Sequence, residues 1–234
     1  MKRVARARAA RAGATPEAAV TYRVAALLLE YPTPELVALV PSLRAAVSEL
    51  PDPLGGPLAQ TLEHVAATPL RELAEQYVET FDLRRRCSLY LTYYAYGDTR
   101  RRGVALVEIK QAYRASGMVP ASDELPDHLA VLLEFASAPD EAARESGVRL
   151  LLAHRAGLEL LRLALLDAGS PWSGAVAAVS ATLPALDGDD REAVARLAAE
   201  GPPGEDVGLD PTLVPAGPTL APYALPASTS GARR

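Results

Sequence analysis

One segment of the sequence concentrates the side chains best suited to binding a partner. Residues 77–103 read YVETFDLRRRCSLYLTYYAYGDTRRRG. They hold five of the nine tyrosines of the chain and two runs of three arginines, Arg84–Arg86 and Arg100–Arg102. Tyrosine gives a large contact area at low entropic cost, and arginine supplies a fork of hydrogen-bond donors; the combination is typical of protein-binding surfaces. The segment therefore indicates a surface that binds a peptide or a protein.

The tyrosines of this segment are too closely spaced to share one buried face of a helix. Tyrosines at positions 90, 93, 94 and 96 point in more than one direction around a helix of 3.6 residues per turn. Some of them must therefore lie at a surface or in a groove. We predict that the partner-binding residues of this segment are Tyr90, Tyr93, Tyr94, Arg84, Arg85, Arg86 and Arg100.

Two other interpretations of these residues stay open. Arginines beside aromatic rings also bind single-stranded nucleic acid, because they attract phosphates while the rings stack on bases. Alternatively, Asp82 and Asp98, which stand shortly before the two arginine runs, neutralise the arginines while most tyrosines pack in the core. The net charge of −5 argues against a dedicated binder of duplex DNA.

A second candidate is the adjacent pair Asp127 and His128, near the start of a predicted helix over residues 126–137. Polar side chains at such a position either cap the end of the helix or contact a bound ligand. We include both residues in the predicted partner-binding site.

The sequence offers little for catalysis or metal binding. Cys87 is the only cysteine, and the three histidines (His64, His128 and His154) are far apart and have no metal-ligand spacing. Glycine-rich phosphate loops and the short signatures of serine hydrolases and zinc proteases are missing. We predict no catalytic residue, no cofactor site and no metal site.

The elements that must position these residues are helices. Alanine and leucine dominate the 49% apolar share and aromatic residues are only 5%, a balance that favours helices over β-sheets. Thr15-Pro16-Glu17 and Thr33-Pro34-Glu35 each place a capping threonine before a proline at the first helical position. Pro41 should kink or split the second of these helices. Further helices are expected near residues 55–67, 69–80, 87–96, 99–116, 126–137, 140–168, 172–183 and 188–200.

Composition divides the chain into three parts. Residues 1–14 carry five basic side chains and no acid and read as a disordered arm; residues 201–234 are rich in proline and glycine and read as a disordered tail. Residues 15–200 form the folded body. The uncharged stretches 168–186 and 211–232 are interrupted by prolines and polar residues, so neither predicts a membrane span. We expect an all-α, single globular bundle of about eight to ten helices between two disordered tails.

Three segments together resemble one protein family, the NarJ-type assembly chaperones of respiratory nitrate reductase. They are residues 77–103, the string LLLEYPTPEL at Leu27–Leu36 and the string ELPDHLAVLLEF at Glu124–Phe135. The family belongs to a wider group of redox-enzyme maturation chaperones, related to TorD and DmsD, that often carries the signature Glu-Pro-x-Asp-His. Here Glu124-Leu125-Pro126-Asp127-His128 matches it with the proline displaced by one position, as in the nitrate reductase branch. The resemblance covers roughly residues 22–200.

The resemblance implies a cytoplasmic, non-enzymatic chaperone with a TorD/NarJ-like helical fold. Such a protein would bind the immature catalytic (alpha) subunit of nitrate reductase, through its N-terminal segment, and support insertion of the molybdenum cofactor before the enzyme docks on the membrane. It would bind no nucleic acid, would not insert into the membrane and would leave the finished enzyme. A helical groove is suited to an amphipathic partner helix. The alternative function is a helical nucleic-acid-binding module that uses the Arg/Tyr-rich segment, and the oligomeric state stays open.

Overall fold

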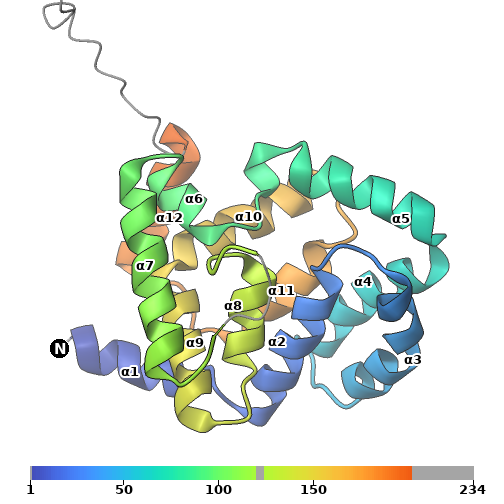
Figure 1. Ribbon diagram of the computed structural model, residues 1–234, viewed down its shortest axis with the longest axis horizontal. Coiled ribbons are helices and arrows are strands. Elements are labelled where there is room, and N and C mark those ends of the chain that lie inside the picture. Colours follow the sequence, from blue (N-terminus) through green and yellow to red (C-terminus); the bar gives the residue numbers. More distant parts are fainter. Residues whose placement is uncertain (1, 120–123, 202–234) are drawn as a thin grey trace, which may run out of the picture.

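The structure of the protein is a computed structural model that describes residues 2–119 and 124–201 (Figure 1). In these ranges it contains twelve α-helices and no β-strand, which confirms the predicted all-α fold. The helices are α1 Lys2–Ala12, α2 Pro16–Leu28, α3 Pro34–Ser48, α4 Gly55–Ala67, α5 Leu70–Tyr77, α6 Leu91–Tyr96, α7 Arg100–Ala115, α8 Leu129–Ala136, α9 Glu141–Ala153, α10 Arg155–Asp167, α11 Ser173–Thr182 and α12 Gly188–Glu200. Between α5 and α6 lie a π-helical turn, η1 Val78–Asp82, and a 3₁₀ turn, η2 Arg85–Cys87.

The helices α2 and α3 begin where the sequence predicts. The side chain of Thr15 accepts a hydrogen bond from the backbone N–H of Ala18 at 3.2 Å, and Thr33 accepts one from Leu36 at 3.3 Å. In both helices a proline follows the capping threonine, at a position whose N–H has no partner inside the helix. The predicted caps are therefore confirmed.

Helix α3 continues through Pro41 and is not split there. A proline at this position removes the hydrogen bond to the carbonyl of Val37, four residues earlier. Both residues lie on the exposed side of α3, so water can satisfy that carbonyl. The split predicted at Pro41 is not observed for this reason.

The single helix predicted over residues 140–168 is two helices in the structure. The backbone leaves helical geometry at His154, with φ −107° and ψ 24°, and α10 starts at the next residue. Helix α9 packs mainly on α8 and α1, whereas α10 packs on α6, α11 and α12. The break lets one apolar stripe face two different sets of neighbours.

Helices α2 and α11 form the centre of the bundle. Helix α2 packs on α4, α8 and α11. Figure 1 shows α3, α4 and α5 on one side of α2, and α7, α9 and α12 on the other. Trp172, just before α11, is 1% exposed, and its ring lies 5.8 Å from that of Tyr77 and 5.4 Å from that of Phe81. This aromatic cluster ties α5 and η1 to the centre.

The N-terminal segment differs from the disordered arm that the sequence predicts, because residues 2–12 form α1. The helix packs on α9, where Ala10 is fully buried and Arg11 pairs with Glu145 at 3.2 Å. Alanine is the best helix former and is small enough to let α1 approach α9. Residues 202–234, which hold nearly all of the predicted disordered tail, lie outside the described residues.

The structure also bears on the two stretches tested as membrane spans. None of the helices in the described ranges combines the length and the apolar character that a span requires. The stretch 211–232 lies outside these ranges.

The packing of α11 on α4 predicts a stability difference between two glycine substitutions. A Cβ at Gly174 would lie 2.2 Å from the carbonyl oxygen of Pro57, whereas one at Gly103 in α7 would meet nothing within 4 Å. Gly174→Ala should therefore lower the free energy of unfolding by about 1–3 kcal/mol because the helices must move apart. Gly103→Ala, the control, should raise it by up to about 1 kcal/mol through helix propensity. Urea unfolding of both variants measures the difference, and similar values would contradict the packing described.

Candidate functional site

Most of the residues predicted to bind a partner fall into two groups around the short helix α6. One group surrounds the buried carboxylate of Asp127, near the start of α6. The other lines an open cleft beside the helix. The predicted site is therefore two structural features that share one helix.

The first group is the Asp127 cluster, which we define as Tyr90, Thr92, Arg102, Asp127 and His128. Asp127 is fully buried, and its Oδ2 accepts hydrogen bonds from the backbone N–H of Thr92 at 3.2 Å and from the Thr92 hydroxyl. Arg102 places Nη2 3.7 Å from the same oxygen and donates from Nε to the Thr92 hydroxyl at 3.2 Å. Asp127 thus caps the N-terminus of α6 and links it to α7.

The backbone on either side of Asp127 strengthens this link. The N–H of Leu91 donates to the carbonyl of Asp127 at 3.1 Å, and the N–H of Leu129 donates to the carbonyl of Leu89 at 2.8 Å. Tyr90 and His128 face each other in the resulting antiparallel bridge, with their ring centres 5.2 Å apart. The signature residues therefore fasten one end of α6.

The side chains of Tyr90 and His128 are neutral in this setting. Burial, together with a 2.9 Å hydrogen bond from the Tyr90 hydroxyl to Glu124, raises the pKa of Tyr90 to about 12. Burial lowers the pKa of His128, so the imidazole is uncharged at pH 7. Asp127 therefore acts as a cap, and the helix that it caps is α6 and not the helix that it precedes. The His128 side chain makes no capping hydrogen bond to α8, and its buried Nδ1 has no partner among the described residues.

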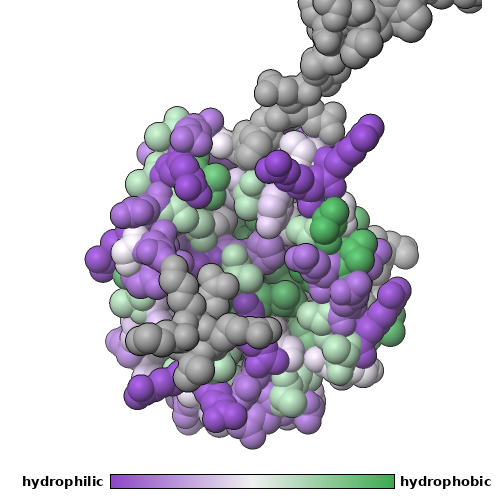
Figure 2. Space-filling view, turned by 90° about the vertical axis from the view of Figure 1, so that its left-hand side faces the viewer, coloured by the Kyte–Doolittle hydropathy of each residue, from purple (hydrophilic) through white to green (hydrophobic). Residues whose placement is uncertain are grey.

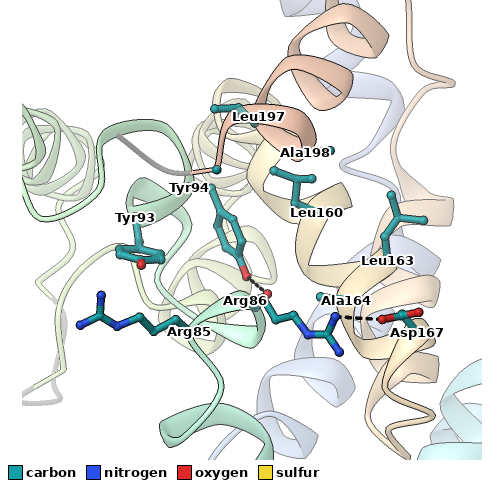
Figure 3. A pocket seen from close by; sticks show the side chains of 11 residues that line it. Arg85, Arg86, Tyr93, Tyr94, Leu160, Leu163, Ala164, Asp167, Leu197 and Ala198 are labelled. Carbon is teal, nitrogen blue, oxygen red and sulfur yellow. Dashed lines mark hydrogen bonds and ion pairs between the residues drawn. The ribbon is translucent and has the colours of Figure 1, made fainter. Parts of the chain in front are cut away.

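The second group belongs to a cleft of about 470 Å³ between η2, α6, α10 and α12, which we call the α6–α12 cleft (Figure 3). Its residues are Arg85, Arg86, Tyr93, Tyr94, Leu160, Leu163, Ala164, Asp167, Leu197, Ala198 and Gly201. In Figure 3 the two tyrosines stand opposite the leucines of α10, and α12 closes the top. The lining is mostly apolar. Its charged side chains lie along the lower edge in Figure 3, which we call the charged end; there Arg86 points to Asp167, and Arg85 points the opposite way, past Tyr93.

The walls of this cleft are fixed by close contacts. Tyr94 is 4% exposed, and its hydroxyl donates to the carbonyls of Arg86 at 2.9 Å and Ser88 at 3.0 Å, which holds η2 against α6. Helix α10 approaches α6 at Gly157, where a Cβ would lie 3.0 Å from the carbonyl oxygen of Leu91. The Arg86 guanidinium pairs with Asp167 at 2.9 Å across the charged end. Tyr93 is partly exposed and presents its ring to the cleft.

The structure does not bring every predicted residue to these two features. Arg84 and Arg100 are exposed and line neither of them. Arg100 begins α7, on a side of the molecule that is largely hydrophilic with separate apolar patches (Figure 2). Arg102, and not Arg100, is the residue of the second arginine run that enters the Asp127 cluster. Asp98, four residues earlier and paired with it at 3.2 Å, is the sequence signal for that role.

The opposite wall of the α6–α12 cleft was missed in the sequence analysis. Leu160, Leu163 and Leu197 lie on α10 and α12, more than 50 residues beyond the aromatic segment. The only local signal is Leu163, a leucine 43% exposed beside the buried stripe of α10. The structure alone brings these residues opposite the tyrosines.

The chemistry available at either feature is binding. In the described part of the chain no group of three or more histidine, cysteine or acidic side chains is arranged to hold a metal. Burial raises the pKa of the Cys87 thiol, which keeps it protonated at pH 7. An apolar cleft of this size with charges at one end is suited to a few apolar side chains of a peptide or helix.

An all-helical fold with an open apolar cleft defines the class as a helical binding protein. The family model described as nitrate reductase delta subunit matches residues 47–178. The chain belongs to this family. The matched range includes α6, α10 and the Asp127 cluster, whereas α12 lies beyond it.

Individual relatives agree with this assignment. The nitrate reductase-like protein NarX of Mycobacterium tuberculosis is 37% identical over 163 residues, which are 70% of this chain but 24% of NarX. This chain therefore spans about a quarter of that relative. The probable nitrate reductase molybdenum cofactor assembly chaperone NarJ of Bacillus subtilis is 36% identical over 132 residues, 56% of this chain and 72% of that protein. NarJ of Escherichia coli is 42% identical over 71 residues, 30% of each chain.

The two NarJ proteins confirm the predicted resemblance to NarJ-type chaperones, since both are named as nitrate reductase molybdenum cofactor assembly chaperones. The family match also includes the two segments, 77–103 and 124–135, that carry most of the predicted resemblance.

The Asp127 cluster predicts unequal effects from removing the two acidic partners of Arg102. Asp127→Ala should lower the free energy of unfolding by about 3–5 kcal/mol, because it leaves a partly buried arginine and the first turn of α6 without their acceptor. Asp98→Ala, the control, removes an exposed partner of the same arginine and should cost at most about 1 kcal/mol. Chemical denaturation measures both, and equal losses would contradict the anchoring role of Asp127.

Proposed function

We propose that this protein is a cytoplasmic chaperone that binds the immature catalytic subunit of nitrate reductase in the α6–α12 cleft. The bound segment is an amphipathic helix near the N-terminus of that subunit. While bound, the subunit stays competent for insertion of the molybdenum cofactor and is kept from docking on the membrane. The chaperone then leaves, and it is not part of the finished enzyme.

The observation that carries this proposal is the cleft together with the family. The NarJ relatives are named as molybdenum cofactor assembly chaperones of nitrate reductase. The cleft of about 470 Å³ has room for the apolar anchor residues of one helix and not for a folded domain. A protein with these relatives and this cleft is suited to hold a segment of its client.

The distribution of charge supports an amphipathic client. Leu160, Leu163 and Leu197 supply apolar walls, while Arg85 and Arg86 stand at the charged end. An acidic side chain flanking the apolar face of a helix would meet these arginines, and such contacts fix direction and register more than they add affinity. The arginines therefore favour one orientation of the bound helix.

The alternative of nucleic-acid binding has less support. Arg86 is paired with Asp167, and Arg102 with Asp98 and Asp127. Single-stranded nucleic acid needs a positively charged groove along which successive phosphates can lie. The α6–α12 cleft has apolar walls along most of its length, so a helix suits it better than a phosphate backbone.

The need to release the client limits the affinity that we expect the chaperone to have for it. A chaperone that must hand its client over should bind with moderate strength, and a dissociation constant of about 1 μM corresponds to about −8 kcal/mol. The small size of the cleft is consistent with a contact of this strength.

The test is the loss of peptide binding in a variant that keeps the fold. A synthetic peptide from the N-terminal segment of the cognate catalytic subunit is titrated calorimetrically into the full chain. Tyr93→Ala should weaken binding about tenfold, which is a loss of about 1.4 kcal/mol, because its ring lines the cleft. Tyr96→Ala is the matched control, since Tyr96 lies on the same helix outside the cleft lining. Equal affinities of the two variants would contradict the proposed site.

Tyr94 is left unchanged in this experiment for a structural reason. Its hydroxyl holds the carbonyls of Arg86 and Ser88, so removing the ring would disturb the cleft wall itself. A loss of binding in Tyr94→Ala would not show whether a contact with the client was removed or the wall of the cleft was disturbed.

A further inference from the structure

We infer that residues 202–214 of this chain, PPGEDVGLDPTLV, bind in the α6–α12 cleft and compete there with its client. The inference concerns the occupant of the cleft. Only its second part, the competition, rests on the function proposed above.

The chain leaves the folded body at the cleft. Leu197, Ala198 and Gly201, from the end of α12 and the residue that follows it, all line the cleft. Gly201 has φ +74°, a left-handed conformation that ends the helix and turns the chain. One extended residue spans at most about 3.6 Å, so the residues that follow can reach either wall within a few positions.

The segment carries the chemistry that the cleft lacks. Glu205, Asp206 and Asp210 are acidic, and no basic residue stands among residues 202–214. Arg85 lines the cleft and is an exposed side chain that pairs with no acidic group among the described residues; its guanidinium points past Tyr93, away from the pair of Arg86 and Asp167. The segment and the cleft are therefore complementary in charge.

The apolar residues and prolines of the segment 202–214 suit the apolar and aromatic walls of the cleft. Val207 and Leu209 stand between Asp206 and Asp210 and are of the size that the leucines of α10 and α12 accept. Pro202-Pro203 favours an extended polyproline II conformation, which aromatic-lined grooves bind at little entropic cost. Tyr93 supplies an aromatic ring of this kind. The sequence of this segment is therefore compatible with binding in an extended conformation.

Tethering makes even a weak contact effective. A short flexible connection gives an effective concentration of about 1 mM, so a segment with an intrinsic dissociation constant of about 100 μM would fill the cleft about nine-tenths of the time. A client would then bind about tenfold more weakly than it does to an empty cleft. The segment would reject weak ligands while a good client still displaces it.

The experiment uses the full chain with labelled leucine methyl groups and compares methyl resonances between variants. The proximal variant combines Glu205→Lys, Asp206→Lys, Val207→Ser and Leu209→Ser. It should shift the signals of Leu160, Leu163 and Leu197 and leave Leu166, which is on α10 outside the cleft lining, unchanged. The control variant, Leu220→Ser with Leu225→Ser, removes apolar residues further along the same tail and should shift none of them.

Three results would overturn the inference. The first is cleft signals that do not move in the proximal variant. The second is equal shifts in the control variant, which would show that no particular segment is bound. The third is shifts that disappear on dilution, because the occupant would then be the tail of a second copy of this chain.

The same variants separate this inference from the proposed function. The client peptide should bind the proximal variant about tenfold more tightly than the wild-type chain, since the tethered competitor is gone. If the cleft signals move but the affinity does not change, the tail occupies the cleft and the client binds elsewhere. If the signals stay fixed while Tyr93→Ala still weakens the peptide, the proposed function stands and this inference fails.

Discussion

The buried carboxylate of Asp127 is the interaction on which the arrangement around α6 depends. It caps the first turn of α6 through Thr92 and attracts Arg102 from α7, while its own backbone pairs with residue 91. A helix of six residues has too few internal hydrogen bonds to be stable alone. The cap that Asp127 supplies from a distant segment therefore gives α6 stability that a longer helix would gain from its own hydrogen bonds. The signature residues hold in place the helix that presents tyrosines to the cleft.

The residues that hold the short helix α6 in place differ from the residues that face the cleft. The residues of the Asp127 cluster are buried or half-buried and are linked by hydrogen bonds, an ion pair and a ring contact, whereas Tyr93 and the two cleft arginines remain accessible. Tyr94 joins the two functions, because its buried ring packs beside Gly157 while its hydroxyl fixes η2. A rigid aromatic wall needs no ordering when a ligand binds, which lowers the entropic cost of a contact that must remain reversible. The opposite wall is supplied by α10, which contributes residues to the core, and by α12, which packs on α10 and has no buried residue of its own.

Local signals in the sequence predicted much of the fold and part of the site. The threonine caps of α2 and α3 were readable because a cap acts within three residues, and the aromatic segment was visible from composition. The break at His154 was not, since it depends on which neighbours α9 and α10 meet in space. Capping was one of two roles that the sequence left open for Asp127, but the residue whose backbone it caps lies 35 positions earlier, and no local signal in the sequence identifies it. The α10 and α12 wall was missed for the same reason.

The central claim is that this protein acts on an immature nitrate reductase, and a deletion strain of the native host tests it most directly. Subunit abundance, transcript level, bound molybdenum cofactor and activity per mature enzyme are measured with and without the chain. A chaperone changes the fraction of its client that matures and leaves the finished enzyme unaltered. The account predicts normal transcript, a reductase poor in cofactor and inactive, and recovery when the chain is restored. Fully loaded, active reductase in the deletion strain would contradict it.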